Sequence, residues 1–232
     1  MKHFTYRSLT ELRQAAETLG ARHVRLEEDV PTIQETLGRA VQVGPVRVGN
    51  SMAVHPMEGC DGTLAGNPDE LTYRRYERFG RGGCKLIWFE ATAVLEEGRA
   101  NTRQLWIHKE NVGDYARILD LTLRSHREEY GRDDDVLVPI QLTHSGRYAV
   151  PKRIIAYNNP LIARKFNMPD DYPLISDDEL DRLPDAFLEA GKLAYAAGFR
   201  AFDLKVTHGY LLSELLGART RPGRYGGSLE NR

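Results

Sequence analysis

Three side chains that can transfer protons or stabilise charge lie close together near the end of the chain. Lys205, His208 and Tyr210 occur within and just beyond the run AFDLKVTH, residues 201–208. Apolar residues in this run, Phe202, Leu204 and Val206, alternate with Asp203 and Lys205, which predicts a strand with one apolar and one charged face. In a barrel the apolar face is expected to pack on helices, which aims Lys205 into the barrel. These residue types suit proton donation combined with stabilisation of an anionic oxygen, or Schiff-base formation at the lysine.

A glutamine inside an apolar run is the next candidate. Gln141 lies within VLVPIQLTH, residues 136–144, whose other positions are mostly apolar. An amide in such a place destabilises the fold unless something pairs with it, so we expect Gln141 to bind a ligand. His144 and Arg147 lie at and beyond the end of this run, and we expect them to anchor the following loop.

The elements that position these residues form a repeating pattern. Short apolar runs alternate with helical patterns, which is typical of βα units and a parallel sheet. The predicted strands are residues 51–57, 85–94, 136–144 and 201–208. Three helices are predicted after these strands. The first has Asn67 as its cap and Pro68 in its first turn. The second has residues from Tyr115 to His126 on one face and ends at Gly131, and the third opens at a capping box of Ser176 and Glu179.

Four βα units are half of the eight that close a barrel. We therefore predict an α/β fold, a (β/α)8 TIM barrel of which residues 44–232 form the N-terminal half, preceded by a helical extension over residues 1–43 with its helix at residues 8–19. Half a barrel leaves two open parallel edges, so we expect a truncated chain that pairs with the missing half-barrel or forms a homo-oligomer. The proline-punctuated stretch after residue 144 is expected on the active-site face.

The composition excludes several classes of function. Thirty-two Lys and Arg balance 33 Asp and Glu to a net charge of −1, which disfavours nucleic acid and anionic membranes as partners. No stretch approaches the ~18 apolar residues of a membrane span, and a secretory signal is missing, so we expect a cytoplasmic protein with a small-molecule substrate. Cys60 and Cys84 are the only cysteines, and we expect free thiols and no metal site.

Four segments carry a resemblance to a known family. THGYLLSELLGARTRPGRYGGSLENR, residues 207–232, closely resembles the fourth-unit signature of the old yellow enzyme family of NADH:flavin oxidoreductases, which includes ene-reductases, 2,4-dienoyl-CoA reductases and trimethylamine dehydrogenase. IQLTHSGR at residues 140–147, HPMEG after the first strand and FEATAV in the second resemble the family's other flavin-contacting segments. All four occur in the expected order over residues 50–232.

The resemblance implies that the full-length parent is an FMN-dependent oxidoreductase that takes electrons from NAD(P)H and transfers hydride to an activated alkene or a related small molecule. Tyr210 matches the family's proton donor, and His208 matches one member of the pair that binds the substrate oxygen. The phosphate site of the flavin, and any iron-sulfur cluster, would belong to a missing C-terminal part. The residues implied to lie near the flavin ring are His55, Pro56, Met57, Glu58 and Ala93, with Gln141 hydrogen-bonded to the ring.

Two positions depart from the family pattern. Lys205 stands where the first member of the substrate-binding pair is commonly His, and Glu58 stands where well-known members have Thr or Cys. A lysine ammonium can still stabilise an enolate-like oxygen, although we expect a different choice of substrate. A carboxylate at Glu58 should disfavour the anionic reduced flavin unless it is protonated or paired with Lys205.

Other interpretations remain open from the residues alone. Lys205 is a candidate Schiff-base residue of a lyase or aldolase, and without its neighbours it would be taken for a salt-bridge partner of Asp203 or Glu90. A metal-dependent hydrolase built on His144 and His208 lacks a third ligand at convincing spacing. An inactive half-barrel is the alternative that is not an enzyme.

Overall fold

The sheet is built from short parallel strands in chain order. The computed structural model describes residues 5–21, 23 and 25–232. β3 pairs with β4, while β5, β6 and β7 pair in that order, and a parallel bridge between Leu86 and Leu137 joins the two groups. The chain thus forms the predicted partial α/β barrel, with strands shorter than their apolar runs. The strands are β3 (Ala53–Val54), β4 (Leu86–Ile87), β5 (Phe89–Ala93), β6 (Ile140–Thr143) and β7 (Phe202–Leu204).

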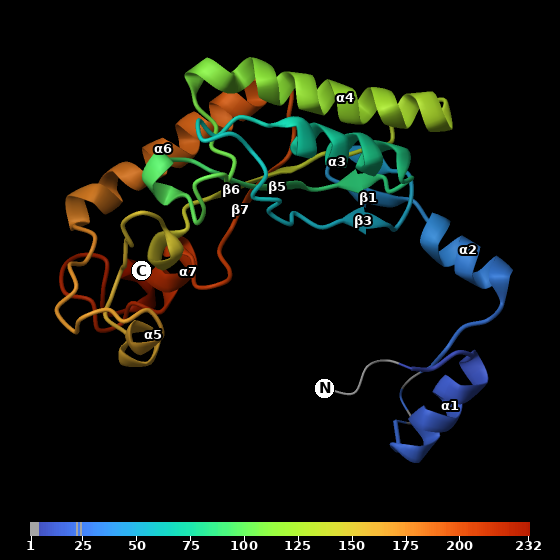
Figure 1. The fold of residues 1–232 in the computed structure, drawn as a ribbon, viewed down its shortest axis with the longest axis horizontal. Helices are drawn as coiled ribbons and strands as arrows, with labels where there is room; N and C mark the ends of the chain where they lie inside the picture. Colours follow the sequence, from blue (N-terminus) through green and yellow to red (C-terminus); the bar gives the residue numbers. More distant parts are fainter. Residues whose placement is uncertain (1–4, 22, 24) are drawn as a thin grey trace.

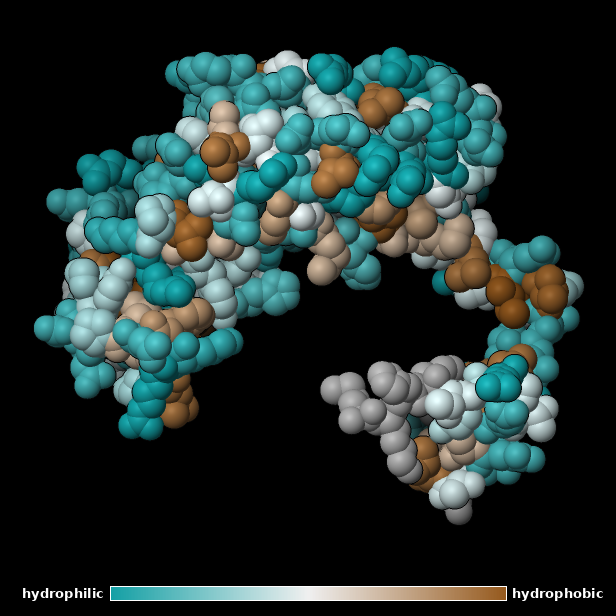
Figure 2. All heavy atoms as spheres, viewed as in Figure 1, coloured by the Kyte–Doolittle hydropathy of each residue, from teal (hydrophilic) through white to brown (hydrophobic). Residues whose placement is uncertain are grey.

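Three long helices cover one face of this sheet (Figure 1). They are α3 (Glu70–Arg81), α4 (Val112–Tyr130) and α6 (Asp177–Ala196), and each lies between consecutive strands of the chain. Their buried side chains form one core with Phe89, Ile140 and Leu142 of the strands. The solvent side of α3 and α4 is mostly hydrophilic (Figure 2). Among the described residues, no helix combines the length and the apolar character that crossing a membrane requires.

The helix ends follow the sequence signals. α4 buries the predicted face and ends at Gly131, whose φ of 77° is left-handed. α6 begins at the predicted capping box, in which Ser176 and Glu179 bond each other's backbone. The predicted cap of α3 at Asn67 is wrong: Asp69 caps this helix in a capping box with Thr72, whereas Oδ1 of Asn67, the atom that a cap would use, accepts a hydrogen bond from Nδ2 of Asn111.

Shorter elements complete the chain. α1 begins at the predicted cap Ser8, buries no residue, and extends with α2 away from the sheet (Figure 1). The antiparallel β1–β2 hairpin that follows α2 has no counterpart among the sequence predictions. These elements are α1 (Leu9–Thr18), α2 (Val30–Gly38), β1 (Val41–Val43), β2 (Val46–Val48), α5 (Pro160–Lys165), α7 (Leu211–Leu216) and the 3-10 turns η1 (Glu96–Gly98), η2 (Lys109–Asn111), η3 (Gly146–Tyr148) and η4 (Leu229–Asn231).

The apolar face of β7 departs from expectation. Phe202, Leu204 and Val206 were expected to pack on helices, yet their exposed fractions are 43%, 53% and 40%. α6, the helix that precedes β7, contacts β6, and β7 lies at the edge of its sheet. The expectation is therefore wrong for the described residues, because the outer face of an edge strand is covered only if a further helix packs on it.

Buried arginines hold the long stretch between β6 and α6. Arg147 is 1% exposed and donates to the Glu214 carboxylate and to the Tyr157 carbonyl. Arg221 likewise donates to the backbone oxygens of Ala156 and Ile175. The predicted role of Arg147 as a loop anchor agrees with these contacts, and the stretch is packed against α7 rather than free.

Gly80 lets α3 and α4 approach each other closely. A Cβ at Gly80 would lie 2.4 Å from the carbonyl oxygen of Thr122 in α4. We expect Gly80→Ala to lower the free energy of unfolding by about 2 kcal/mol, because the packed backbones must separate. Chemical denaturation measures this change. The control is Gly191→Ala in α6, where a Cβ meets nothing within 4 Å and a gain of up to ~1 kcal/mol is expected; equal effects of the two changes would contradict the interpretation.

Candidate active site

Polar side chains gather on the sheet face opposite the helices, called the inner face here. Ile140 and Leu142 of β6 point into the helix-covered core, so the alternating residue Gln141 lies on the inner face. Its register partner on β7 is Asp203, and the backbone of Lys205 continues this ladder by donating to the Leu142 carbonyl. The inner face therefore presents an amide, a carboxylate and an amine from two adjacent strands.

One carboxylate oxygen joins the two sequence candidates that can transfer protons. Nζ of Lys205 lies 2.9 Å from Oε1 of Glu58, and the hydroxyl of Tyr210 donates to the same oxygen over 3.2 Å. The side chains of Lys205 and Glu58 are only 6% and 14% exposed, and Nζ also lies 4.3 Å from the centre of the Tyr210 ring. From the sequence, Asp203 and Glu90 were possible salt-bridge partners of Lys205, and a pairing with Glu58 was raised as well; the partner is Glu58.

This arrangement changes the acidity of Tyr210. Burial raises the pKa of its hydroxyl well above the usual value, and the neighbouring Glu58 carboxylate raises it further because it disfavours a second negative charge and accepts the proton in a hydrogen bond. The Tyr148 ring packs beside it, with ring centres 5.6 Å apart. Tyr210 is thus a phenol that keeps its proton until a strongly basic atom is placed next to it.

A buried ionic network holds the loop that carries Glu58. The backbone nitrogen of Gly59 donates to Oε2 of Glu90 over 2.8 Å, and the guanidinium of Arg75 lies 2.8 Å from both Glu90 and Asp61. Glu90 is 1% exposed, and its burial raises the pKa of the carboxyl group, an effect that Arg75 opposes. The loop after β3 is therefore tied to β5 and α3, which places Glu58 beside Lys205.

The sequence analysis did not name Arg75 or Asp61 as part of the site. A signal for such a network was present in the sequence. Glu90 lies in the apolar run FEATAV, and a buried carboxylate needs a partner, as a buried amide does. Cys60, in the same loop, is a free thiol like Cys84. Burial and then the Glu58 carboxylate raise the pKa of the Cys60 thiol, so a reactive thiolate is disfavoured there.

The remaining predicted flavin and substrate residues differ in how far they are exposed. His208 is exposed, adopts a left-handed φ of 61° and lies 6.3 Å from Tyr210 between ring centres. His55 and Met57 are also exposed, the latter to 73%, and Pro56 is half-buried. Ala93 is buried, and its backbone nitrogen donates to the Leu105 carbonyl. Glu58, Lys205 and Tyr210 are thus in direct contact, whereas His55, Pro56 and Met57 precede Glu58 along its loop.

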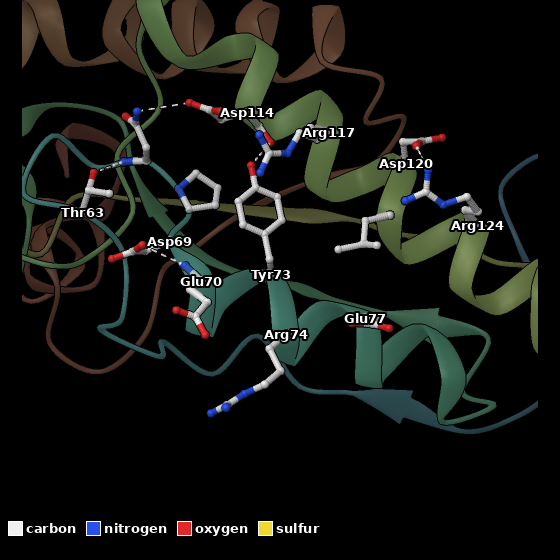
Figure 3. A pocket seen from close by; sticks show the side chains of 13 residues that line it. Thr63, Asp69, Glu70, Tyr73, Arg74, Glu77, Asp114, Arg117, Asp120 and Arg124 are labelled. Carbon is white, nitrogen blue, oxygen red and sulfur yellow. Dashed lines mark hydrogen bonds and ion pairs between the residues drawn. The ribbon is translucent and has the colours of Figure 1, made fainter.

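A wide hollow lies elsewhere on the molecule. It occupies about 950 Å³ between α3 and α4, where Figure 3 shows Arg117 over the ring of Tyr73, 4.4 Å from its centre, among acidic side chains such as Glu70 and Asp120. None of the sequence-predicted site residues lines it. Its charges of both signs face open solvent, so the converging contacts around Glu58 remain the better candidate for chemistry.

The metal-site alternative has no geometric support. Within the described part of the chain, no cluster of three or more His, Cys, Asp and Glu side chains could hold a metal ion. Nδ1 of His144 accepts a hydrogen bond from the Gly146 nitrogen, and burial lowers the pKa of His144 to about 4. Its ring thus helps to hold the turn after β6.

Comparison with known proteins agrees with this geometry. Residues 37–232 match the NADH:flavin oxidoreductase / NADH oxidase family. The chain is 31% identical over 192 residues to an NADPH dehydrogenase of Geobacillus sp. (strain WCH70), an alignment that covers 81% of this chain and 53% of that protein. An NADPH dehydrogenase of Listeria monocytogenes serotype 4b (strain CLIP80459) is 30% identical over 186 residues, which cover 78% of this chain and 50% of that protein. The chain spans about half the length of these relatives.

A similarity in structure extends over the same region. The crystal structure of Old Yellow Enzyme from Pichia sp. AKU4542 superimposes with a TM-score of 0.70 over 84% of this chain and 53% of that chain, at 18% sequence identity. At this identity the likeness concerns the fold. It identifies the parallel strands and helices described above as part of a TIM barrel.

The first prediction of this site concerns the Glu58–Lys205 pair. Breaking a buried ion pair from one side leaves an uncompensated charge, so Glu58→Gln and Lys205→Met should each destabilise the chain, and the double variant should lose less than the sum. We expect a coupling energy of about 2 kcal/mol from the double-mutant cycle, measured by denaturant unfolding. The exposed pair Asp120 and Arg124 serves as a control, with coupling below about 0.5 kcal/mol. Additive effects at Glu58 and Lys205 would refute the pairing.

A second prediction concerns the pH dependence of stability. The pKa of His144 falls from 6.5 to about 4 on folding because the ring is desolvated, so between these values the unfolded chain binds more protons than the folded chain. Stability should be full above pH 6.5 and decline towards pH 4, by up to about 1.4 kcal/mol per pH unit from this group. His144→Gln should flatten that decline between pH 6.5 and 5 in unfolding experiments. An unchanged slope in the variant would argue against a buried neutral His144.

Proposed function

Because the chain belongs to the NADH:flavin oxidoreductase / NADH oxidase family, we propose that its inner-face site serves an oxidoreductase that uses FMN and NAD(P)H to reduce an activated alkene or a related small molecule. The observation that carries this proposal is the convergence of Lys205 and Tyr210 on one Glu58 oxygen, on the sheet face that also carries Gln141. An ordered cation and a proton-bearing phenol are the groups that such a reduction needs from the protein.

The residues present are suited to hold a flavin ring. Oε1 of Gln141 takes no hydrogen bond from any described residue, although the side chain is only 9% exposed. Exposed His55 and Met57 lie on the loop that leads from β3 to Glu58. A planar ring with hydrogen-bonding edges can rest on such a loop and bond to such an amide. We propose that His55, Pro56, Met57, Glu58, Ala93 and Gln141 hold the ring of FMN.

The side chains divide the work of the proposed reaction. A reduced flavin supplies hydride when it is bound. Lys205 stabilises the negative charge that develops on the substrate oxygen, with exposed His208 as a second donor. Tyr210 then gives its proton to the basic carbon, and its raised pKa keeps that proton in place beforehand. Glu58 orients both donors and balances the charge of Lys205.

The Schiff-base alternative fits the geometry less well. A lysine that attacks a carbonyl must present a free amine lone pair. Nζ of Lys205 is instead bound to Glu58 and lies over the ring of Tyr210, two contacts that suit an ammonium group. The contacts therefore favour charge stabilisation by Lys205 over nucleophilic attack.

The test separates flavin binding from proton transfer. The chain mixed with FMN should turn yellow and gain thermal stability; a colourless chain without such protection would contradict the proposal and favour an inactive half-barrel. In the flavin-loaded protein, Tyr210→Phe should slow alkene reduction about 100-fold and leave flavin reduction by NADPH unchanged in stopped-flow measurements. The control is Tyr195→Phe on α6, an exposed ring, for which we expect no change in either step.

A further inference from the structure

The amide of Gln141 is held from one side by an acid on the neighbouring strand. Nε2 of Gln141 donates to Oδ2 of Asp203 over 2.6 Å. The two residues are register partners on β6 and β7, so the short contact follows directly from strand pairing. Gln141 is only 9% exposed, and the contact fixes a largely buried group.

The chemistry of the pair permits one orientation of the amide. An ionised carboxylate only accepts hydrogen bonds, whereas an amide has one accepting and one donating end. The nitrogen of Gln141 must therefore face Asp203, and the oxygen must face away from it. We infer that Asp203 is a positioning residue that fixes Gln141 so that Oε1 is offered to a ligand as an acceptor.

The nearby charges leave Asp203 free for this role. Lys205 lies two residues further along the same face, and it would compete with Gln141 for Asp203 if its amine were unpaired. Glu58 holds that amine instead, at 2.9 Å, and no described residue forms an ion pair with Asp203. The Glu58–Lys205 pair therefore supports the Asp203–Gln141 pair. If Lys205 bound Asp203 instead, the amide of Gln141 would lose the acceptor that fixes it.

A fixed acceptor selects the ligand that it meets. The inference about the ligand rests on the proposed function, in which Gln141 bonds the pyrimidine edge of a flavin. That edge carries an N–H group between two carbonyl groups. Oε1 matches the N–H, so a flavin methylated at this nitrogen should lose the hydrogen bond, whereas a freely turning amide could rotate and donate to a carbonyl group of either flavin.

The first measurement needs no flavin. Nitrogen-15 NMR of the chain resolves the two hydrogens on Nε2 of Gln141, whose signal is assigned by its loss in Gln141→Leu. We expect one hydrogen to exchange with water at least about 10-fold more slowly than the other, and Asp203→Ala to abolish the difference. Asp185→Ala, at an exposed position of α6, should preserve it. Equal exchange in the wild type, or a difference that survives Asp203→Ala in the folded chain, would overturn the inference.

The second measurement addresses the ligand. We expect the wild-type chain to bind FMN about 10-fold more tightly than its N3-methylated form. In Asp203→Asn, whose side chain both donates and accepts, the preference should fall below about threefold; an undiminished preference would contradict the role of Asp203. If Asp203 orders the amide and neither flavin binds, the positioning inference is upheld and the proposed function fails.

Discussion

Lys205 and Tyr210 come together because one oxygen of Glu58 lies between them. Glu58 belongs to the loop after β3, and Lys205 follows β7, so the contact spans the width of the sheet. A flexible loop would lose this contact, since two nearly buried charges must be kept at hydrogen-bonding distance. The rigidity comes from Glu90, which binds the Gly59 nitrogen, and from Arg75 behind it.

The buried or half-buried acids of the site are each matched with a donor. Glu58 takes the amine of Lys205, Glu90 takes Arg75 together with a backbone nitrogen, and Asp203 takes the amide of Gln141. Each of these pairings matters for stability because the groups are little exposed, and an unpaired buried charge destabilises the fold by several kcal/mol.

This pairing also bears on how the chain differs from the family pattern that it resembles. Lys205 and Glu58 both replace residues of other kinds, and the structure shows that the two replacements contact each other. In the proposed site, the positive charge of Lys205 is thereby matched by the negative charge of Glu58. The paired charges cancel, whereas the donor that we propose for the substrate oxygen is an ammonium in place of the imidazole common in the family that the sequence resembles.

The sequence alone determined the order of βα units, the caps at Ser8 and Ser176, the end of α4 at Gly131 and the candidates Gln141, Lys205 and Tyr210, because periodicity, capping and alternation act between neighbours in the chain. Two predictions from the sequence were wrong: the cap of α3 at Asn67 and the packing of the apolar face of β7 under helices. Both depend on which distant segments lie nearby. The choice of Glu58 among the possible partners of Lys205, the network around Arg75 and the orientation of Gln141 were decided only by the tertiary structure. Each joins residues on different strands or helices, and strand register sets their distances.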